Sequence, residues 1–220
     1  MKTCVAVLLI GIAGSGALAQ DAPQSVKLPE PRHQGAMSLE AALWARQSVR
    51  TLTRDSITLA EIGQLLWAAQ GVNRPNGHRT APSAGATYPL ELYLVASRVS
   101  GLPAGVYHYG VAGHALEPVA AGDRLREFVD GAVRQAWVAD AAAVIVFTAV
   151  SGRAARFGAR AERFVPMDVG HAAENVYLQT AALGLGTTFA GSVQDTAAAR
   201  ILALPADRTA MGIMPIGHPR

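Results

Sequence analysis

The chain has 220 residues, of which 50% are hydrophobic and 16% are charged, and its formal net charge is +3. This length suits one medium-sized domain, and the composition excludes disordered, collagen-like and coiled-coil chains. The small net charge gives no basis for a nucleic-acid partner. The single cysteine, Cys4, excludes a disulfide framework, and no cysteine and histidine residues have the spacing of a zinc site, so we expect no metal.

The first residues have the layout of a secretory signal peptide. A short positive start precedes an apolar run at 4–13, and Ala17-Leu18-Ala19 provides the small residues of a cleavage site. The apolar run is too short to cross a bilayer. We therefore predict a signal peptide at 1–19 and a periplasmic or secreted protein without stable membrane insertion after cleavage; the alternative is a buried N-terminal helix. We expect an extended, proline-rich arm at 20–36 and a folded domain at 37–220 to follow.

Several stretches predict helices. Residues 38–47 carry apolar side chains behind Ser38, a favoured N-cap residue. Thr58 and Glu61 have the spacing of a capping box, which predicts a second helix that ends at Gly71. Further helices are predicted at 123–134, 168–183 and 196–202.

Strands are predicted at 90–96, 105–109, 141–150, 187–190 and 210–216. The run at 141–150 is apolar throughout, as is typical of a strand buried on both faces. A polar stretch at 73–85, with several proline and glycine residues, predicts a long loop. Because helices and strands mix without strict alternation, we predict an α+β fold.

Two predicted helix faces carry polar side chains at intervals of three and four residues, which brings them together on one side. The first face carries Arg153, Arg156, Arg160 and Arg163, and the second carries Asp168, His171 and Asn175. The arginine face is either a solvated surface or a patch that steers an anionic substrate. His171 is either a structural histidine or a candidate catalytic residue.

Three further segments contain small residues, hydroxyls or cations. They are RQSVR at 46–50, PSAGATYP at 82–89 and GLGTTFAG at 184–191. Arginine and serine close together can hold a phosphate through charge-assisted hydrogen bonds. Small residues let a ligand approach the backbone closely. Each segment alone also fits a solvated helix end, an ordinary turn or a tight connection.

Taken together and in this order, these segments resemble the nitroreductase-like family of flavin mononucleotide (FMN) enzymes. Within that family they are most similar to the SagB/ThcOx-type branch, which includes azoline dehydrogenases. The resemblance rests on RQSVR (46–50), APSAGATYPLELYLVA (81–96), GVYHY (105–109), DVGHAAENVYLQTAALGLG (168–186) and PIGHP (215–219). It implies a central mixed or antiparallel sheet flanked by helices, a homodimer, and non-covalent FMN at the dimer interface.

The resemblance also assigns cofactor contacts. The family's Arg-x-Ser-x-Arg/Lys pattern, which holds the phosphate, ribityl chain and pyrimidine edge, matches Arg46, Ser48 and Arg50. The family's loop beneath the flavin matches Ser83, Ala84 and Gly85, and its backbone N–H toward flavin N5 falls at Ala190 and Gly191. Longer members continue into a tail with phosphate-binding cations, whose role Arg220 is the candidate to take.

The chain departs from the branch at one informative place. Azoline dehydrogenases carry a Lys-Tyr pair where this chain has Arg156-Phe157. Arginine stays charged near neutral pH and phenylalanine has no hydroxyl, so this pair cannot transfer protons in that way. The resemblance implies that the flavin carries the reaction, so no side-chain acid or base is required. The candidates for a catalytic side chain are Arg156, His171 and Tyr88, and Tyr88 stands where nitroreductases often carry glutamine.

These observations predict an exported FMN-dependent oxidoreductase that works by ping-pong hydride transfer through flavin N5. Its substrate is expected to be a small molecule, such as a nitroaromatic compound or a quinone, and NAD(P)H is the candidate electron donor. The alternative is a non-catalytic flavin-binding protein or a degenerate family member.

Overall fold

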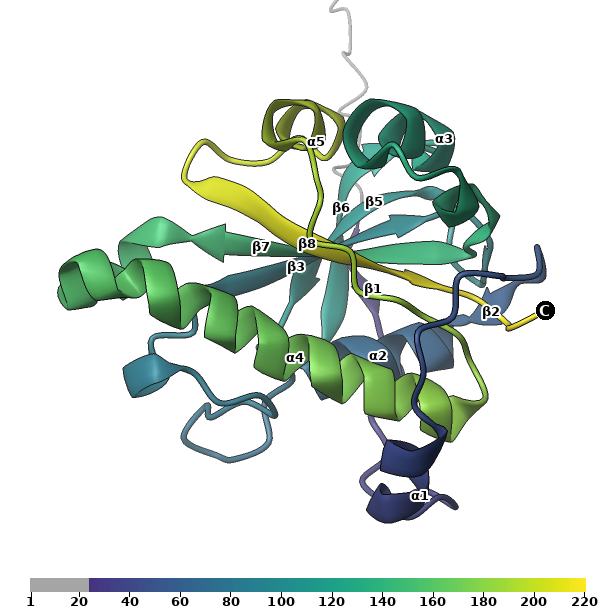
Figure 1. Ribbon diagram of the computed structural model, residues 1–220, viewed down its shortest axis with the longest axis horizontal. Coiled ribbons are helices and arrows are strands. Elements are labelled where there is room, and N and C mark those ends of the chain that lie inside the picture. Colours follow the sequence, from purple (N-terminus) through teal and green to yellow (C-terminus); the bar gives the residue numbers. More distant parts are fainter. Residues whose placement is uncertain (1–23) are drawn as a thin grey trace, which may run out of the picture.

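The computed structural model describes residues 24–220, so the predicted signal peptide at 1–19 lies outside the described residues (Figure 1). The described part of the chain forms a six-stranded sheet in the order β1-β6-β5-β3-β7-β8, and every neighbouring pair is antiparallel. Its strands are β1 (Val26–Lys27), β3 (Leu90–Ala96), β5 (Gly105–Gly110), β6 (Ala115–Ala121), β7 (Ala143–Val150) and β8 (Arg208–Ile216). The short strands β2 (Ile57–Thr58) and β4 (Val99–Ser100) form a separate parallel pair.

Helices cover both faces of the sheet (Figure 1). They are α1 (Leu39–Ala45), α2 (Leu59–Gln70), α3 (Leu125–Phe128), α4 (Ala161–Leu183) and α5 (Asp195–Ile201). Figure 1 shows α2 and the long α4 on one side, with α3 and α5 on the other. This arrangement confirms the predicted α+β fold with a central sheet flanked by helices.

The two helical layers explain why the central strands are apolar throughout. On β3, Leu92 and Leu94 belong to the core shared with α2 and α4, whereas Tyr93 and Val95 belong to the core shared with α3 and α5. Successive side chains of a strand point to opposite faces, so both sets must be apolar. All residues of β7 are buried as well, as the apolar run at 141–150 predicted.

The predicted start of α1 and both predicted ends of α2 are confirmed, whereas α1 ends at Ala45 and not at the predicted residue 47. Ser38 accepts a hydrogen bond from the Ala41 N–H at the start of α1. The Thr58 side chain accepts from the Glu61 N–H while the Glu61 carboxylate accepts from the Thr58 N–H, which completes the capping box. The Gly71 N–H donates to the Trp67 carbonyl and α2 ends there. Among the helices of residues 24–220, none combines the length and apolar character needed to cross a bilayer.

Two predicted elements differ from the structure, and strand β6 was not predicted. Residues 123–134 form only a short α3, followed by a π-helical turn that ends at Arg134 with φ of 57°. Residues 187–190 form no regular strand and contribute a single bridge between Ala190 and Ile213. β6 was not predicted, because its sequence, ALEPVAA, contains a proline and only one β-branched residue.

The prediction of four arginines on one helix face is wrong. Arg153 and Arg156 lie in a 3₁₀ segment, Ser151–Arg160, whose backbone is interrupted at Gly158 with φ of 55° and ψ of −138°. Arg163 lies beyond this break, in α4. Glycine tolerates this conformation, so the helical period is lost between the second and third arginines. α4 also begins before the predicted residue 168, with Pro166 in its second turn.

Candidate functional site

The segment at 46–50 is fixed against the segment at 187–191. The Val49 N–H donates to the Thr187 carbonyl at 2.8 Å, and the Thr188 hydroxyl donates to the Val49 carbonyl at 2.8 Å. These bonds join residues that lie far apart in the sequence. Two of the segments that carry the family resemblance therefore lie side by side.

Tyr177 of α4 joins the same two segments, and the sequence did not reveal it as a site residue. Its hydroxyl lies 3.4 Å from the Ser48 Oγ and accepts a hydrogen bond from the Phe189 N–H at 2.7 Å. The Arg46 guanidinium lies over its ring, 5.3 Å from the centroid, at a distance typical of a cation–π contact. The only sequence signal for Tyr177 was its place on the apolar face of a predicted helix.

Of the two backbone N–H groups predicted to face the flavin, at Ala190 and Gly191, only one is without an acceptor in the described residues. The Ala190 N–H donates to the Ile213 carbonyl at 2.9 Å, so its hydrogen is already used within the sheet. Within residues 24–220, no acceptor forms a hydrogen bond with the Gly191 N–H. The prediction of a backbone donor toward a flavin therefore remains for Gly191 alone.

The C-terminus brings a further cation to this region. Arg220 donates from its backbone N–H to the Thr51 carbonyl at 3.0 Å, which places it beside the residue that follows Arg50. In the part of the chain that the structure describes, no carboxylate forms an ion pair with Arg46, Arg50 or Arg220. The Arg220 guanidinium donates to the Leu52 carbonyl at 3.4 Å, and the Arg46 guanidinium lies over Tyr177. Guanidinium groups without a carboxylate partner suit a phosphate, which Arg binds by charge-assisted, often bidentate, hydrogen bonds. We call Arg46, Ser48, Arg50, Gly191 and Arg220 the cationic cluster.

A second group of predicted site residues forms the 83–88 loop, which Asp168 anchors from α4. The Ser83 hydroxyl donates to Asp168 Oδ2 at 2.6 Å, and the Ala84 N–H donates to Asp168 Oδ1 at 3.3 Å. The Tyr88 N–H in turn donates to the Ser83 Oγ at 3.0 Å. The buried carboxylate of Asp168 therefore fixes the start of the loop directly.

The loop has an unusual backbone. Gly85, Ala86 and Tyr88 all have positive φ, of 53°, 53° and 45°. Non-glycine residues in this region carry a cost of roughly 1 kcal/mol or more each, so the surroundings must hold them there. At Gly85 a Cβ would lie 1.9 Å from Arg156 Nη2, whose guanidinium donates to the Gly85 carbonyl. Glycine is required at this position for its φ and for this close approach.

The three candidate catalytic residues have different surroundings. Arg156 is bonded to the 83–88 loop, and Tyr88 is part of it, with its hydroxyl accepting from the Arg79 N–H at 3.3 Å. His171 is exposed on α4, and no hydrogen bond among residues 24–220 joins it to the loop. Over the same residues, no group of three histidine, cysteine, aspartate or glutamate side chains is placed to hold a metal ion.

The cationic cluster and the 83–88 loop are separated along α4. Asp168 anchors the loop and Tyr177 contacts the cluster. At 1.5 Å and 100° per residue, these two positions lie about 13 Å apart along the helix axis and on roughly opposite sides of it. The structure therefore brings the predicted cofactor residues together as two groups rather than as one.

Comparison with known proteins decides the family. The sequence model of the nitroreductase family matches residues 43–218. The chain belongs to the nitroreductase family. It is accordingly an FMN-dependent oxidoreductase, as predicted.

Individual relatives agree with this assignment. A protein of Methanocaldococcus jannaschii that is named as a nitroreductase is 38% identical over 183 residues, which cover 83% of this chain and 91% of the relative. A crystal structure of a Ralstonia eutropha protein, described in the same terms, has a TM-score of 0.77 and 31% identity over 91% of each chain. The Escherichia coli microcin synthetase McbBCD complex with truncated pro-MccB17 has a TM-score of 0.70 and 21% identity, covering 100% of this chain and 85% of that chain. At this identity the likeness shows the fold alone.

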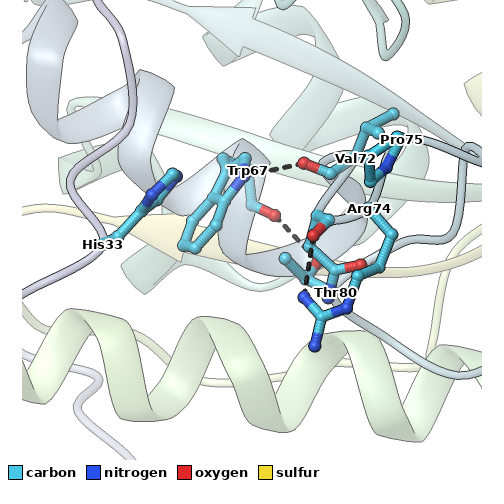
Figure 2. Close-up of a pocket in the computed structure, with 7 residues that line it drawn as sticks. His33, Trp67, Val72, Arg74, Pro75 and Thr80 are labelled. Carbon is cyan, nitrogen blue, oxygen red and sulfur yellow. Dashed lines mark hydrogen bonds between the residues drawn. The ribbon is translucent and has the colours of Figure 1, made fainter.

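The described part of the chain has a cavity of about 680 Å³ beside Trp67. Figure 2 shows the Trp67 indole between His33 on one side and Val72, Arg74 and Pro75 on the other. The indole N–H donates to the Val72 carbonyl at 3.3 Å, and the His33 ring is stacked at 5.4 Å between centroids. None of the predicted site residues lines this cavity.

An exposed apolar surface lies next to it. The surface consists of Met37, Leu39, Leu43 and Trp44, and we call it the α1 surface. Trp44 is 92% exposed. Met37 also lines a second cavity, of about 290 Å³, which shares Trp67 with the first. Met37 therefore belongs both to the α1 surface and to the lining of the second cavity. Apolar patches of this kind on soluble proteins mark interaction sites.

A buried group of charges lies in the sheet behind the 83–88 loop. Glu91 of β3 accepts from His108 Nε2 at 2.5 Å, and Glu117 of β6 lies 2.8 Å from His108 Nδ1. Arg153 pairs with the other Glu91 oxygen at 2.5 Å. Burial opposes ionisation of Glu91, but the hydrogen bonds and charges of His108 and Arg153 outweigh it and lower the pKa of Glu91 to about 2. Burial likewise disfavours charge on His108, but its two carboxylate partners outweigh this and raise its pKa.

We expect the free energy of unfolding to fall as pH rises through the folded-state pKa of His108. This pKa is raised above the usual 6.5, so protonated His108 stabilises the fold below that value and the contribution is lost at higher pH. Glu91 stays ionised over this window, and the other groups facing His108 are Glu117 and the Tyr93 ring. Urea titrations between about pH 5.5 and about pH 8.5 measure how steeply the free energy of unfolding falls with pH. His108→Gln should remove this fall, whereas the exposed His78→Gln should retain it; equal slopes in all three proteins contradict the prediction.

Proposed function

We propose that this nitroreductase-family chain is an exported oxidoreductase that binds each FMN between two copies of itself and works by ping-pong hydride transfer. The observation that carries the proposal is the cationic cluster. It contains three guanidinium groups without carboxylate partners among the described residues, a serine hydroxyl and a backbone N–H without an acceptor there, and the family resemblance assigns FMN contacts to these residues.

The residues of the cluster fit FMN chemically. Arg46, Arg50 and Arg220 would hold the phosphate, Ser48 the ribityl chain or pyrimidine edge, and the Gly191 N–H would face the flavin ring. Bound FMN supplies a centre that accepts and returns a hydride, and the protein positions it and tunes its electronics. The small residues of the 83–88 loop let its backbone approach the ring closely.

Two observations support a homodimer. The cationic cluster and the 83–88 loop stand on roughly opposite sides of α4, about 13 Å apart along its axis, so a flavin that touches both needs the loop of a second copy. The exposed α1 surface ends directly at the 46–50 segment and provides apolar area for the contact.

The substrate we propose is a small electrophile, such as a nitroaromatic compound or a quinone, with NAD(P)H as the electron donor. The sequence APSAGATYPLELYLVA favours the SagB/ThcOx-type branch. Azoline oxidation through a proton-transferring side-chain pair is nevertheless disfavoured, because Arg156 is engaged by the Gly85 carbonyl and its neighbour is Phe157. Export is supported by the signal-peptide pattern at 1–19.

The test is gel filtration of residues 20–220 after incubation with FMN, with absorbance recorded across the peak. We expect flavin absorbance to elute with a dimer, and NAD(P)H under anaerobic conditions to bleach it before a quinone restores it. Colourless protein would overturn the proposal. Bound FMN that no donor reduces would favour the alternative of a flavin-binding protein without turnover.

A further inference from the structure

We propose that Glu91 is a positioning residue that fixes the 83–88 loop for FMN through Arg153. The inference rests on the proposed function, because the loop matters to FMN only if FMN binds against it. No element of the family resemblance assigned a role to Glu91 or to the Arg153 contact.

Glu91 is a buried charged residue in a strand whose other residues are uncharged. It is the second residue of β3, whose sequence is LELYLVA, in the interior of the sheet, and it is only 6% exposed. A buried carboxylate is costly unless it is paired and hydrogen-bonded. Both Glu91 oxygens are engaged, one by His108 and the other by Arg153. Apolar residues occupy the flanking positions, so core packing alone does not explain a glutamate here.

Arg153 connects this buried carboxylate with the loop. Its Nη2 pairs with Glu91 Oε1 at 2.5 Å, while its Nη1 donates to the Tyr88 carbonyl at 3.0 Å. Arg153 is partly exposed and belongs to the 3₁₀ segment Ser151–Arg160, so without Glu91 its long side chain has many other conformations. The buried carboxylate selects the one that reaches the loop.

The carbonyl that Arg153 binds belongs to Tyr88, whose backbone is strained. Tyr88 has φ of 45°, and the Arg79 guanidinium lies 4.8 Å from its ring centroid. Asp168 anchors Ser83 and Ala84 at the start of the loop, and Arg153 anchors Tyr88 at its end, where β3 begins. Two buried carboxylates thus fix the two ends, one directly and one through an arginine. A loop held in its binding conformation spares FMN the entropic cost of ordering it.

The experiment compares Glu91→Gln with Glu117→Gln. Both remove one carboxylate partner of His108, but only Glu91 also contacts Arg153. For Glu91→Gln we expect FMN to bind about 10-fold more weakly. Amide hydrogen exchange in the FMN-free protein should accelerate at 83–88 while β7 stays protected. Glu117→Gln should bind FMN within about twofold of the wild type, with unchanged loop exchange.

Arg153→Gln keeps the test decisive if Glu91→Gln destabilises the sheet. Arg153 is partly exposed and Glu91 keeps its His108 partner, so this variant retains the core packing, and it should reproduce the 10-fold weaker FMN binding and the faster loop exchange. The double variant should bind FMN no more weakly than either single variant, because both substitutions break the same contact between Glu91 and Arg153. Unchanged FMN affinity and loop exchange in Arg153→Gln overturn the role of Glu91 while leaving the proposed function intact. A wild-type protein that binds no FMN overturns both.

Discussion

Arg50→Glu is expected to lower the affinity for FMN about 100-fold and to leave the free energy of unfolding within about 0.5 kcal/mol of the wild type. Arg50 is exposed, follows α1 in an irregular segment, and forms no ion pair among the described residues. Replacing the Arg50 guanidinium therefore breaks no ion pair among the described residues. A hydrogen bond to a charged group contributes about 1.5–3 kcal/mol, and a carboxylate in its place also repels the phosphate. Quenching of flavin fluorescence on titration with the FMN-free protein measures the affinity.

The matched control is Arg126→Glu, which changes the net charge equally. Arg126 is exposed on α3, is not part of the cationic cluster, and pairs with Asp130 at 2.8 Å. Its reversal should leave FMN binding within about twofold of the wild type and cost roughly 0.5 kcal/mol of stability. If both variants bind FMN equally weakly, the effect comes from total charge. If neither changes the affinity, the phosphate does not bind at 46–50.

The sequence was sufficient where local rules decide the structure. The capping box of Thr58 and Glu61, the stop at Gly71 and the apolar run at 141–150 depend on neighbouring residues or on a simple periodicity, and the structure confirms all three. Gly184 likewise ends α4 with φ of 69°. These features define both ends of α2, the end of α4 and the buried strand β7.

Long-range contacts account for the features that the sequence missed. Tyr177 joins Ser48 to Phe189 only because the fold brings α4 against the 46–50 segment, and no pattern within α4 indicates that. The Ala190 N–H is used by Ile213, a pairing between segments that no local rule predicts. A single glycine, Gly158, breaks the arginine periodicity, since its φ is available to glycine at little cost.

Trp44→Asp is expected to convert the dimer into a monomer and to weaken FMN binding by at least about 100-fold. Trp44 is 92% exposed within one copy, so its replacement leaves the monomer's own contacts almost unchanged. Aromatic residues at the centre of an interface often contribute 2 kcal/mol or more, and a buried unpaired carboxylate adds a further cost. Gel filtration with light scattering measures the mass, and flavin fluorescence the affinity. Trp44→Phe is the matched control and should retain both dimer and FMN.

A mixed dimer separates a shared flavin site from a site within one chain. Gly85→Val disrupts the 83–88 loop, because a Cβ at Gly85 collides with Arg156 and the residue has positive φ. A dimer with Arg50→Glu in one copy and Gly85→Val in the other keeps one intact combination of cluster and loop if each site is shared. It should therefore bind one FMN per dimer with near wild-type affinity, although neither homodimer binds well. If each chain holds its own flavin, both sites are damaged and the mixed dimer binds as weakly as the two homodimers. That result, or a Trp44→Asp monomer with unchanged FMN affinity, would place the flavin within a single copy.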